Sequence, residues 1–233
     1  MLMVAASAQD PYAAPRAKMI DEIAAMARDT ASETGRAAFS FRVMNAIAKV
    51  ERHRYVAPGD EAHAYRNTPL AIGSGQTISQ PYMVALMTDL LELNGGEKVL
   101  EVGTGSGYQA AVLCALTAAV YSIEIVEPLG RVAAQRLAAG GYRNVITRIG
   151  DGYQGWPEAA PFDAIMVTAA AREIPPALIE QLKPGGKLVI PLGAPGSHQE
   201  LLLLTKSAAG ATHTRRVLGV RFVPLTGGPD NKK

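Results

Sequence analysis

Glycines and carboxylates gather around position 103 in the pattern of a site for a nucleotide-like ligand. The run from 101 to 107 reads Glu-Val-Gly-Thr-Gly-Ser-Gly, with a predicted buried strand before it and a predicted helix after it. Glycines let a backbone approach a ligand closely, and the first turn of the helix offers free N–H groups. The first chemistry predicted is therefore the binding of a nucleotide-like cofactor.

The spacing of this loop alone leaves two cofactor classes open. The segment 105–110 satisfies the G-x-G-x-x-G/A form of dinucleotide sites, and Glu124 lies near the ~20-residue offset of a ribose-binding acid. Glu101, however, places a carboxylate where the cationic methionine moiety of S-adenosylmethionine would lie and where a pyrophosphate would be repelled. Asp151, in a Gly-Asp-Gly turn, is suited to accept from an adenine amino group, and Glu124 to chelate ribose hydroxyls. These carboxylates favour S-adenosylmethionine.

Alternating strands and helices must position these residues. Strands are predicted over 98–102, 120–124, 144–149, 164–167 and 188–191, and helices over 81–93, 108–116, 129–139 and 176–182. Strands separated by helices of that length imply a mostly parallel sheet covered on both faces. After Pro191 the runs 199–205 and 216–225 have no helix between them, which predicts a hairpin and antiparallel strands at the sheet edge.

The first seventy residues are predicted to form a helical appendage. Ile20, Ile23, Ala24 and Ala27 recur at helical spacing, and a second helix is expected from about 39 to 50. The basic run 52–54 that follows is interpreted as a solvated face or a set of helix-dipole partners rather than a binding patch. The segment 68–80 has the composition of a linker, and 229–233 that of a flexible tail.

Composition excludes several classes of function. The 233-residue chain has 23 basic and 21 acidic residues, so no strong field draws it to nucleic acid or to an anionic membrane. Its single cysteine excludes an intramolecular disulfide, and its four histidines lack metal-ligand spacing. No apolar run approaches the ~20 residues of a membrane span. The start, Met1 to Ala8, ends in the small-x-small form of a signal-peptidase site but lacks a basic n-region. We therefore expect a cytoplasmic protein. The alternative is a periplasmic protein, if this run is the remnant of an export signal.

The order of motifs from Val50 to Leu225 resembles the protein-L-isoaspartate O-methyltransferase family. The glycine loop and the Lys-Pro-Gly-Gly turn at 183–186 are shared with many methyltransferases. The segments Gly75-Gln76-Thr77-Ile78-Ser79-Gln80-Pro81 and Arg221-Phe222-Val223-Pro224-Leu225 are far more specific. The residues before Val50 match least.

The resemblance implies a fold, a reaction and partners. It implies a Rossmann-like α/β methyltransferase domain over 71–228, after the appendage 1–70. The family transfers a methyl group from S-adenosylmethionine, leaving S-adenosylhomocysteine, to the free α-carboxyl of L-isoaspartyl residues in damaged proteins and peptides, and the ester then closes to a succinimide that begins repair. An α-carboxylate is already anionic at neutral pH, so no base is required. We expect a monomer with isoaspartyl proteins as partners and with no metal, nucleic acid or membrane.

The resemblance also assigns site residues. Ser79 matches the family's active-site serine and would hold the attacking carboxylate; its alternative role is to cap the helix that opens at Pro81. The cofactor site is expected to comprise Thr77, Ile78, Ser79, Glu101, Gly103, Thr104, Gly105, Ser106, Gly107, Tyr108, Glu124, Ile125, Asp151, Gly152 and Thr168. The acceptor site is expected to comprise Ala71, Ile72, Ser79, Thr168, Ala169, Val220, Phe222 and Pro224.

Three other functions fit parts of the sequence. A methyltransferase acting on RNA would be expected to carry a basic stripe, which the near-neutral charge argues against, whereas one acting on a small metabolite stays open. A nicotinamide-dependent oxidoreductase needs a hydride-relay group such as Tyr-x-x-x-Lys, and none stands out. An inactive binding module would be expected to lack Ser79 or the loop 101–107, and both are present.

Overall fold

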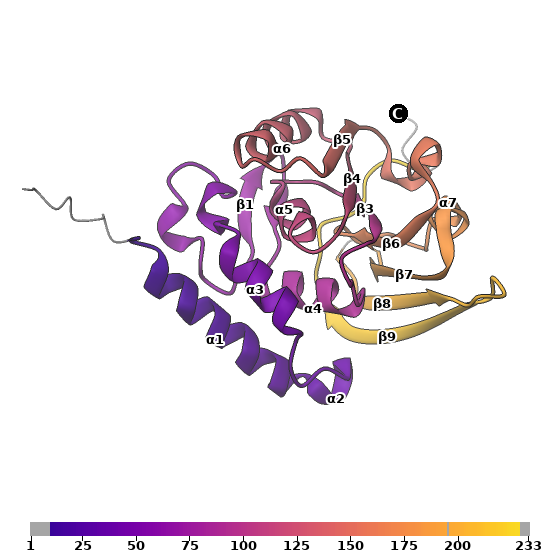
Figure 1. Ribbon diagram of the computed structural model, residues 1–233, viewed down its shortest axis with the longest axis horizontal. Coiled ribbons are helices and arrows are strands. Elements are labelled where there is room, and N and C mark those ends of the chain that lie inside the picture. Colours follow the sequence, from indigo (N-terminus) through magenta and orange to yellow (C-terminus); the bar gives the residue numbers. More distant parts are fainter. Residues whose placement is uncertain (1–9, 195, 229–233) are drawn as a thin grey trace, which may run out of the picture.

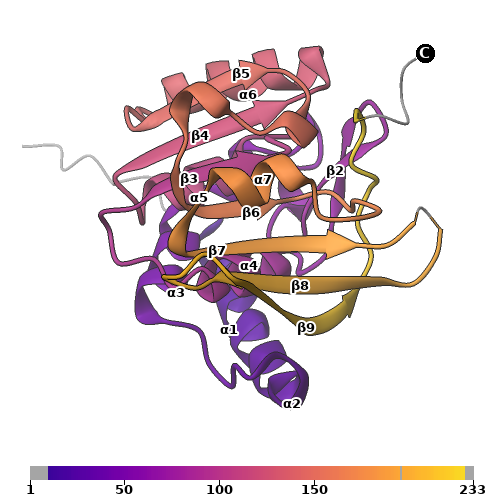
Figure 2. The same cartoon turned by 90° about the vertical axis from the view of Figure 1, so that its right-hand side faces the viewer.

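The computed structural model describes residues 10–194 and 196–228 of the chain. Its centre is a seven-stranded sheet with the order β5-β4-β3-β6-β7-β8-β9, in which the first five of these strands are parallel and the last two antiparallel. Figure 2 shows the strands stacked in this order. Their bounds are β3 Lys98–Val102, β4 Ala119–Glu124, β5 Val145–Ile149, β6 Phe162–Val167, β7 Leu182–Leu192, β8 Gln199–Lys206 and β9 Thr212–Val220. The predicted α/β architecture with antiparallel C-terminal strands is confirmed.

Helices cover both faces of the sheet because its central strands are apolar on both sides. On β3, Val99 packs into one hydrophobic cluster with the helices of the N-terminal half, while the adjacent Leu100 packs into a second cluster that includes Leu178. The helices are α1 Ala13–Asp29, α2 Ala31–Thr34, α3 Phe41–Lys49, α4 Pro81–Leu90, α5 Tyr108–Cys114, α6 Glu127–Ala139 and α7 Pro176–Gln181, with single 3₁₀ turns at Arg52–Arg54, Glu61–His63, Gly152–Gln154 and Pro157–Ala159.

The N-terminal helices belong to the same core as the sheet. Met19, Ile23 and Ala27 of α1 are fully buried and share a cluster with Leu86 of α4 and Val99 of β3. Figure 1 shows α1 running alongside α3 and α4. The predicted helical spacing is confirmed, and the buried face joins this segment to the sheet rather than leaving it as a separate layer.

Two segments differ from the sequence-based prediction. The segment 68–80, expected to be a linker, contains a two-stranded antiparallel hairpin, β1 Leu70–Gly73 and β2 Gln76–Ile78. The last strand, expected over 216–225, runs from Thr212 to Val220 instead. Residues 221–228 leave the sheet and run along the carboxyl ends of its parallel strands, where Pro224 forms an isolated bridge with Ala170 after β6 and Gly228 reaches Asp151 after β5. No helix in the described part of the chain is long and apolar enough to cross a membrane, and the signal-like run Met1 to Ala8 lies outside it.

Candidate active site

The glycine loop forms the floor of the site because β3 ends in a turn that only glycine tolerates. Gly103 has φ 96°, and a Cβ on it would lie 2.4 Å from Thr168 Oγ1. That hydroxyl donates to the carbonyl oxygens of Val102 and Gly103, at 3.1 and 2.6 Å. The loop is therefore fixed against the end of β6, and α5 begins directly after it at Tyr108.

Glu124 ends β4 and ties the next strand to the loop. Its Oε2 accepts from the Gly105 amide at 2.7 Å, and its Oε1 accepts from the Val126 amide at 2.8 Å. A carboxylate has about four acceptor positions, so two stay free toward the cavity that Glu124 lines. The arrangement is suited to receive two ligand hydroxyls on an acceptor that is held in place by two backbone amides.

Glu101 lies beneath the loop and is fully buried. Ser122 Oγ donates to Glu101 Oε2, and the Ser122 and Thr104 hydroxyls are 2.5 Å apart, so the carboxyl is linked to the loop through two hydroxyls. Oε1 has no hydrogen-bond partner. Burial, with a smaller contribution from the charge of Glu124 and opposed by the Ser122 hydrogen bond, raises the pKa of Glu101 to about 8. The carboxyl is therefore protonated at neutral pH in the absence of a nearby cation.

Asp151 follows β5 and holds the C-terminal segment. Its Oδ1 accepts from the Tyr153 amide at 2.9 Å, which caps a 3₁₀ turn, and its Oδ2 accepts from the Gly228 amide at 2.8 Å. Gly227 packs directly on this carboxylate, since a Cβ there would lie 2.4 Å from Oδ1. The strap formed by residues 223–228 thus passes over the strand ends at this side of the sheet.

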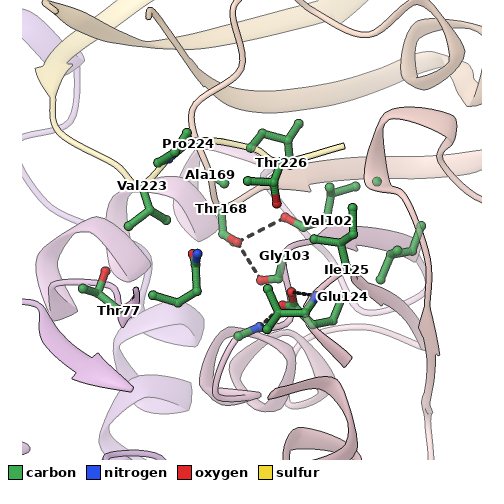
Figure 3. A pocket seen from close by; sticks show the side chains of 16 residues that line it. Thr77, Val102, Gly103, Glu124, Ile125, Thr168, Ala169, Val223, Pro224 and Thr226 are labelled. Carbon is green, nitrogen blue, oxygen red and sulfur yellow. Dashed lines mark hydrogen bonds between the residues drawn. The ribbon is translucent and has the colours of Figure 1, made fainter. Parts of the chain in front are cut away.

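Figure 3 shows the first cavity, between the glycine loop and this strap. Val102, Gly103, Glu124 and Ile125 form one wall, and Val223, Pro224 and Thr226 of the strap face them. Its volume is about 50 Å³, which holds only a few water molecules. A nucleoside-sized ligand therefore requires the cavity to widen. The strap forms one wall outside the helices and the main sheet, and it is joined to the strand ends by backbone hydrogen bonds at Ala170 and by Asp151.

A second cavity, of about 510 Å³, opens beside the first. Ser79 lines it, together with the start of α4, the end of β9 and Met26 of α1, and Ser79 also lines a small cleft against the loop residues Gly103 to Ser106. Thr77 and Thr168 line both cavities and this cleft. The two cavities therefore meet at Thr77, Thr168 and Val223, and Ser79 lies beside this junction, between the second cavity and the cleft.

The capping interpretation of Ser79 is wrong. The N-cap of α4 is Gln80, and no side chain caps the helix. A proline at the first helical position has no N–H to be satisfied, which reduces the need for a cap. The Ser79 hydroxyl makes no hydrogen bond to any residue in the described part of the chain, so it is available to a ligand.

Most of the predicted cofactor residues come together. Twelve of them line the first cavity or the cleft, and the three that do not are Glu101, Gly107 and Asp151. Of the predicted acceptor residues, Ser79, Thr168, Val220 and Phe222 line the second cavity, whereas Ala169 and Pro224 line the first and Ala71 and Ile72 line neither.

Other lining residues were missed at the sequence level. Val223, Leu225 and Thr226 form part of the first cavity, and Met26 and His198 part of the second. The Arg-Phe-Val-Pro-Leu segment includes Val223 and Leu225, but its apolar pattern predicts a strand, whereas the structure has a strap there. Met26 gave no signal, because it is one apolar position among several on α1.

Comparison with known proteins gives a consistent family. The model of the family described as Protein-L-isoaspartate(D-aspartate) O-methyltransferase (PCMT) matches residues 31–230, which extends the match toward the N-terminus beyond the motifs seen from Val50. The chain is 57% identical over 222 residues to the Protein-L-isoaspartate O-methyltransferase 2 of Syntrophobacter fumaroxidans, covering 95% of this chain and 90% of that one.

Two solved structures have a similar fold. A protein-L-isoaspartate O-methyltransferase structure superposes with TM-score 0.79 at 28% identity and covers 91% of this chain, which spans 66% of that one. A Plasmodium falciparum beta-aspartate methyltransferase (PCMT), solved in complex with S-adenosyl-L-homocysteine, superposes with TM-score 0.76 at 24% identity and covers 94% of this chain and 99% of that one. At that identity the second structure supports the fold alone.

Proposed function

Since the chain belongs to the protein-L-isoaspartate(D-aspartate) O-methyltransferase family, we propose that its first cavity holds S-adenosylmethionine and its second an isoaspartyl peptide. The enzyme transfers a methyl group to the free α-carboxyl of L-isoaspartyl residues. The observation that carries the assignment of residues is that the two cavities share Thr77 and Thr168, while Ser79 lines both the second cavity and the cleft against the glycine loop. The Ser79 hydroxyl has no hydrogen-bond partner among the described residues.

The residues of the first cavity fit this cofactor chemically. Glu124 offers its free acceptor positions to the ribose hydroxyls, and the Gly152 turn beside Asp151 suits the adenine. Glu101 is a buried carboxyl beneath the loop, and its Oε1 has no hydrogen-bond partner among the described residues. A cationic ligand nearby would stabilise the ionised form of this carboxyl. When bound, the cofactor supplies an electrophilic sulfonium methyl, and its transfer to a carboxylate oxygen leaves S-adenosylhomocysteine.

Ser79 is proposed to orient the acceptor. An α-carboxyl has a reference pKa near 3.5 and is anionic at neutral pH, so the protein needs no base to activate it. A hydroxyl donor holds one carboxylate oxygen and leaves the other directed at the loop side of the site. Alignment of this kind, with exclusion of water by the walls of both cavities, lowers the barrier without proton transfer. The methyl ester then closes to a succinimide, whose hydrolysis restores part of the normal aspartyl linkage.

The acceptor peptide is proposed to lie along the end of β9. Val220 and Phe222 line the second cavity, and β9 is the edge strand of the sheet, paired only with β8. A peptide bound through backbone groups at such an edge is recognised with little dependence on its side chains. This suits an enzyme whose substrates share one altered linkage in many sequence contexts.

We further propose a cytoplasmic monomer with no nucleic-acid partner. The formal net charge of +2 supports the last point, because nucleic-acid binding requires clustered positive charge. Sedimentation of the purified protein tests the monomer, and fractionation of the source cells tests the compartment.

One assay tests the proposed reaction. Transfer of a labelled methyl group from S-adenosylmethionine is measured with an isoaspartyl peptide and with its aspartyl twin. We expect label only in the isoaspartyl peptide, lost again as the ester closes to the succinimide. Equal labelling of the two peptides, or none of the first, would exclude the repair reaction.

A further inference from the structure

Arg52 is a buried cation without a carboxylate partner. The sequence predicted an exposed basic run at 52–54, and this prediction is wrong for Arg52, whose side chain is fully buried, whereas Arg54 is exposed and paired with Glu51. Arg52 Nε donates to the Ala64 carbonyl at 2.8 Å. Both of its Nη atoms are buried, and neither makes a well-aligned hydrogen bond to any described residue, although the guanidinium lies close to the Tyr108 hydroxyl. Burial lowers its pKa only to about 10, so the side chain stays charged at neutral pH.

The face of Tyr108 is the main partner of this cation. The guanidinium carbon lies 4.9 Å from the centroid of the Tyr108 ring, within the range of a cation–π interaction. Tyr55 packs edge-on against the same ring, with centroids 5.6 Å apart. The ring is thus held between two side chains from the segment 52–55. Its buried hydroxyl makes no well-aligned hydrogen bond among the described residues, and the nearest charge to it is the Arg52 guanidinium.

Tyr108 is the first residue of α5 and follows the glycine loop directly. Its amide donates to Ser106 Oγ at 3.3 Å. Tyr108 and Ser106 line the cleft that Ser79 also lines, on the loop side of the site. Any rotation of the Tyr108 side chain therefore acts on the backbone that closes the loop.

A charge buried without a counter-ion is unfavourable for folding. Tertiary packing alone would be served as well by an apolar side chain of similar length. The retained charge acts instead on the groups it faces, of which Tyr108, directly after the loop, contributes most to its environment.

We propose that Arg52 is a positioning residue for cofactor binding, which acts through Tyr108 to fix the end of the loop Gly103 to Gly107. This inference rests on the proposed function, because it assigns the loop to S-adenosylmethionine. It makes the N-terminal segment part of the cofactor site although none of its residues lines the first cavity.

The test measures affinity for S-adenosylhomocysteine by titration calorimetry, which requires no turnover. Arg52→Met removes the cation and keeps an unbranched apolar side chain, Arg52→Lys keeps a cation, and Arg54→Met is the matched control on the same turn. We expect Arg52→Met to weaken binding about tenfold, the size of a desolvated cation–π contact. Arg52→Lys should recover part of the loss, and Arg54→Met should bind as the unchanged protein does. The KM for S-adenosylmethionine should rise with the dissociation constant, while the KM for the peptide should stay the same.

A double-mutant cycle separates positioning from general destabilisation. Tyr108→Leu alone should weaken binding as much as Arg52→Met, and the double variant should be no weaker than either, because both remove one contact. If Arg52→Met does not fold, the affinities of Tyr108→Leu and Arg52→Lys for S-adenosylhomocysteine provide the same test. Wild-type affinity in folded Arg52→Met, or additive losses in the cycle, would overturn the proposal. Failure of the unchanged protein to bind S-adenosylhomocysteine would overturn the proposed function and this inference with it.

Discussion

Replacing Glu101 by Gln should change how the stability of the protein depends on pH. The side chain is fully buried, accepts from Ser122 and has one unpartnered oxygen. Gln keeps an acceptor for Ser122 in nearly the same volume but has no proton to lose. The substitution therefore removes one ionisation and little of the packing.

The direction follows from the raised pKa. Glu101 titrates at about 8 in the folded protein against 4.5 as its ordinary value. Between these values the folded state retains a proton that the unfolded state has released, so the free energy of unfolding falls by about 1.4 kcal/mol for each unit of rising pH. The contribution is fully present below the unfolded pKa, and its loss reaches the order of 5 kcal/mol above the folded pKa. In the Glu101→Gln variant, this contribution to the pH dependence of the free energy of unfolding is absent.

Urea unfolding at several pH values from about 5.5 to 8.5 measures the difference. The fluorescence of Trp156, the single tryptophan, reports the transition in both proteins. We expect the variant to gain stability relative to the unchanged protein steadily across this range. Parallel pH profiles would show that Glu101 is already ionised in the folded state, and the argument from burial would fail.

The same variant tests whether Glu101 senses the cofactor. A cation near a buried carboxyl lowers its pKa, so binding of S-adenosylmethionine below about pH 8 should release a proton from the unchanged protein and none from Glu101→Gln. Calorimetry in buffers of different ionisation enthalpy measures that proton. Equal proton release by both proteins would mean that the charge of the cofactor lies too far from Glu101 to act on it.

Three further substitutions probe the site. Ser79→Ala should lower kcat about ten- to a hundredfold, the range for losing a hydrogen bond to a charged group, and leave the affinity for S-adenosylhomocysteine unchanged; unchanged turnover would remove the serine from acceptor orientation. Gly103→Ala should abolish cofactor binding because its Cβ would meet Thr168 at 2.4 Å, whereas Gly141→Ala, also at positive φ but with open space around it, should bind normally. Gly227→Ala should release the strap from Asp151, because its Cβ would lie 2.4 Å from the carboxylate. Stopped-flow binding should then show faster association and dissociation of the cofactor. Unaltered rates would mean that the strap does not control access to the cavity.

Strands β3 and β4 were predictable because each is short, apolar and bounded by turn residues. The predicted strand 98–102 coincides with β3, and Val120 to Glu124 is all of β4 but its first residue. The hairpin at 70–78 was not predictable in this way. Its strands have four and three residues, and the glycines between them have the composition of a linker.

The end of β9 was misplaced because an apolar run was equated with a strand. Thr212 to Arg215 are polar and mostly exposed yet pair with β8, since an edge strand needs backbone partners rather than a buried face. Val223 and Leu225 are apolar for a different reason, which is that they cover the first cavity. Nothing in the sequence pattern indicated that Arg52 is buried, because only tertiary packing brings its partner Tyr108 to it.

The three carboxylates at the strand ends acquire different roles from the order of the strands. Glu101, one residue before the end of β3, is fully buried. Glu124 ends β4, the next strand toward the edge, and is 6% exposed, while Asp151 follows the edge strand β5 and is only half-buried. Burial of a carboxyl favours its protonated form, so Glu101 keeps a proton and is able to respond to a cation. Glu124 and Asp151 instead accept two backbone amides each. The sequence predicts that all three reach one edge of a parallel sheet. It does not predict which strands lie inside the sheet, because that depends on how the crossovers stack, and the burial of each carboxyl follows from that order.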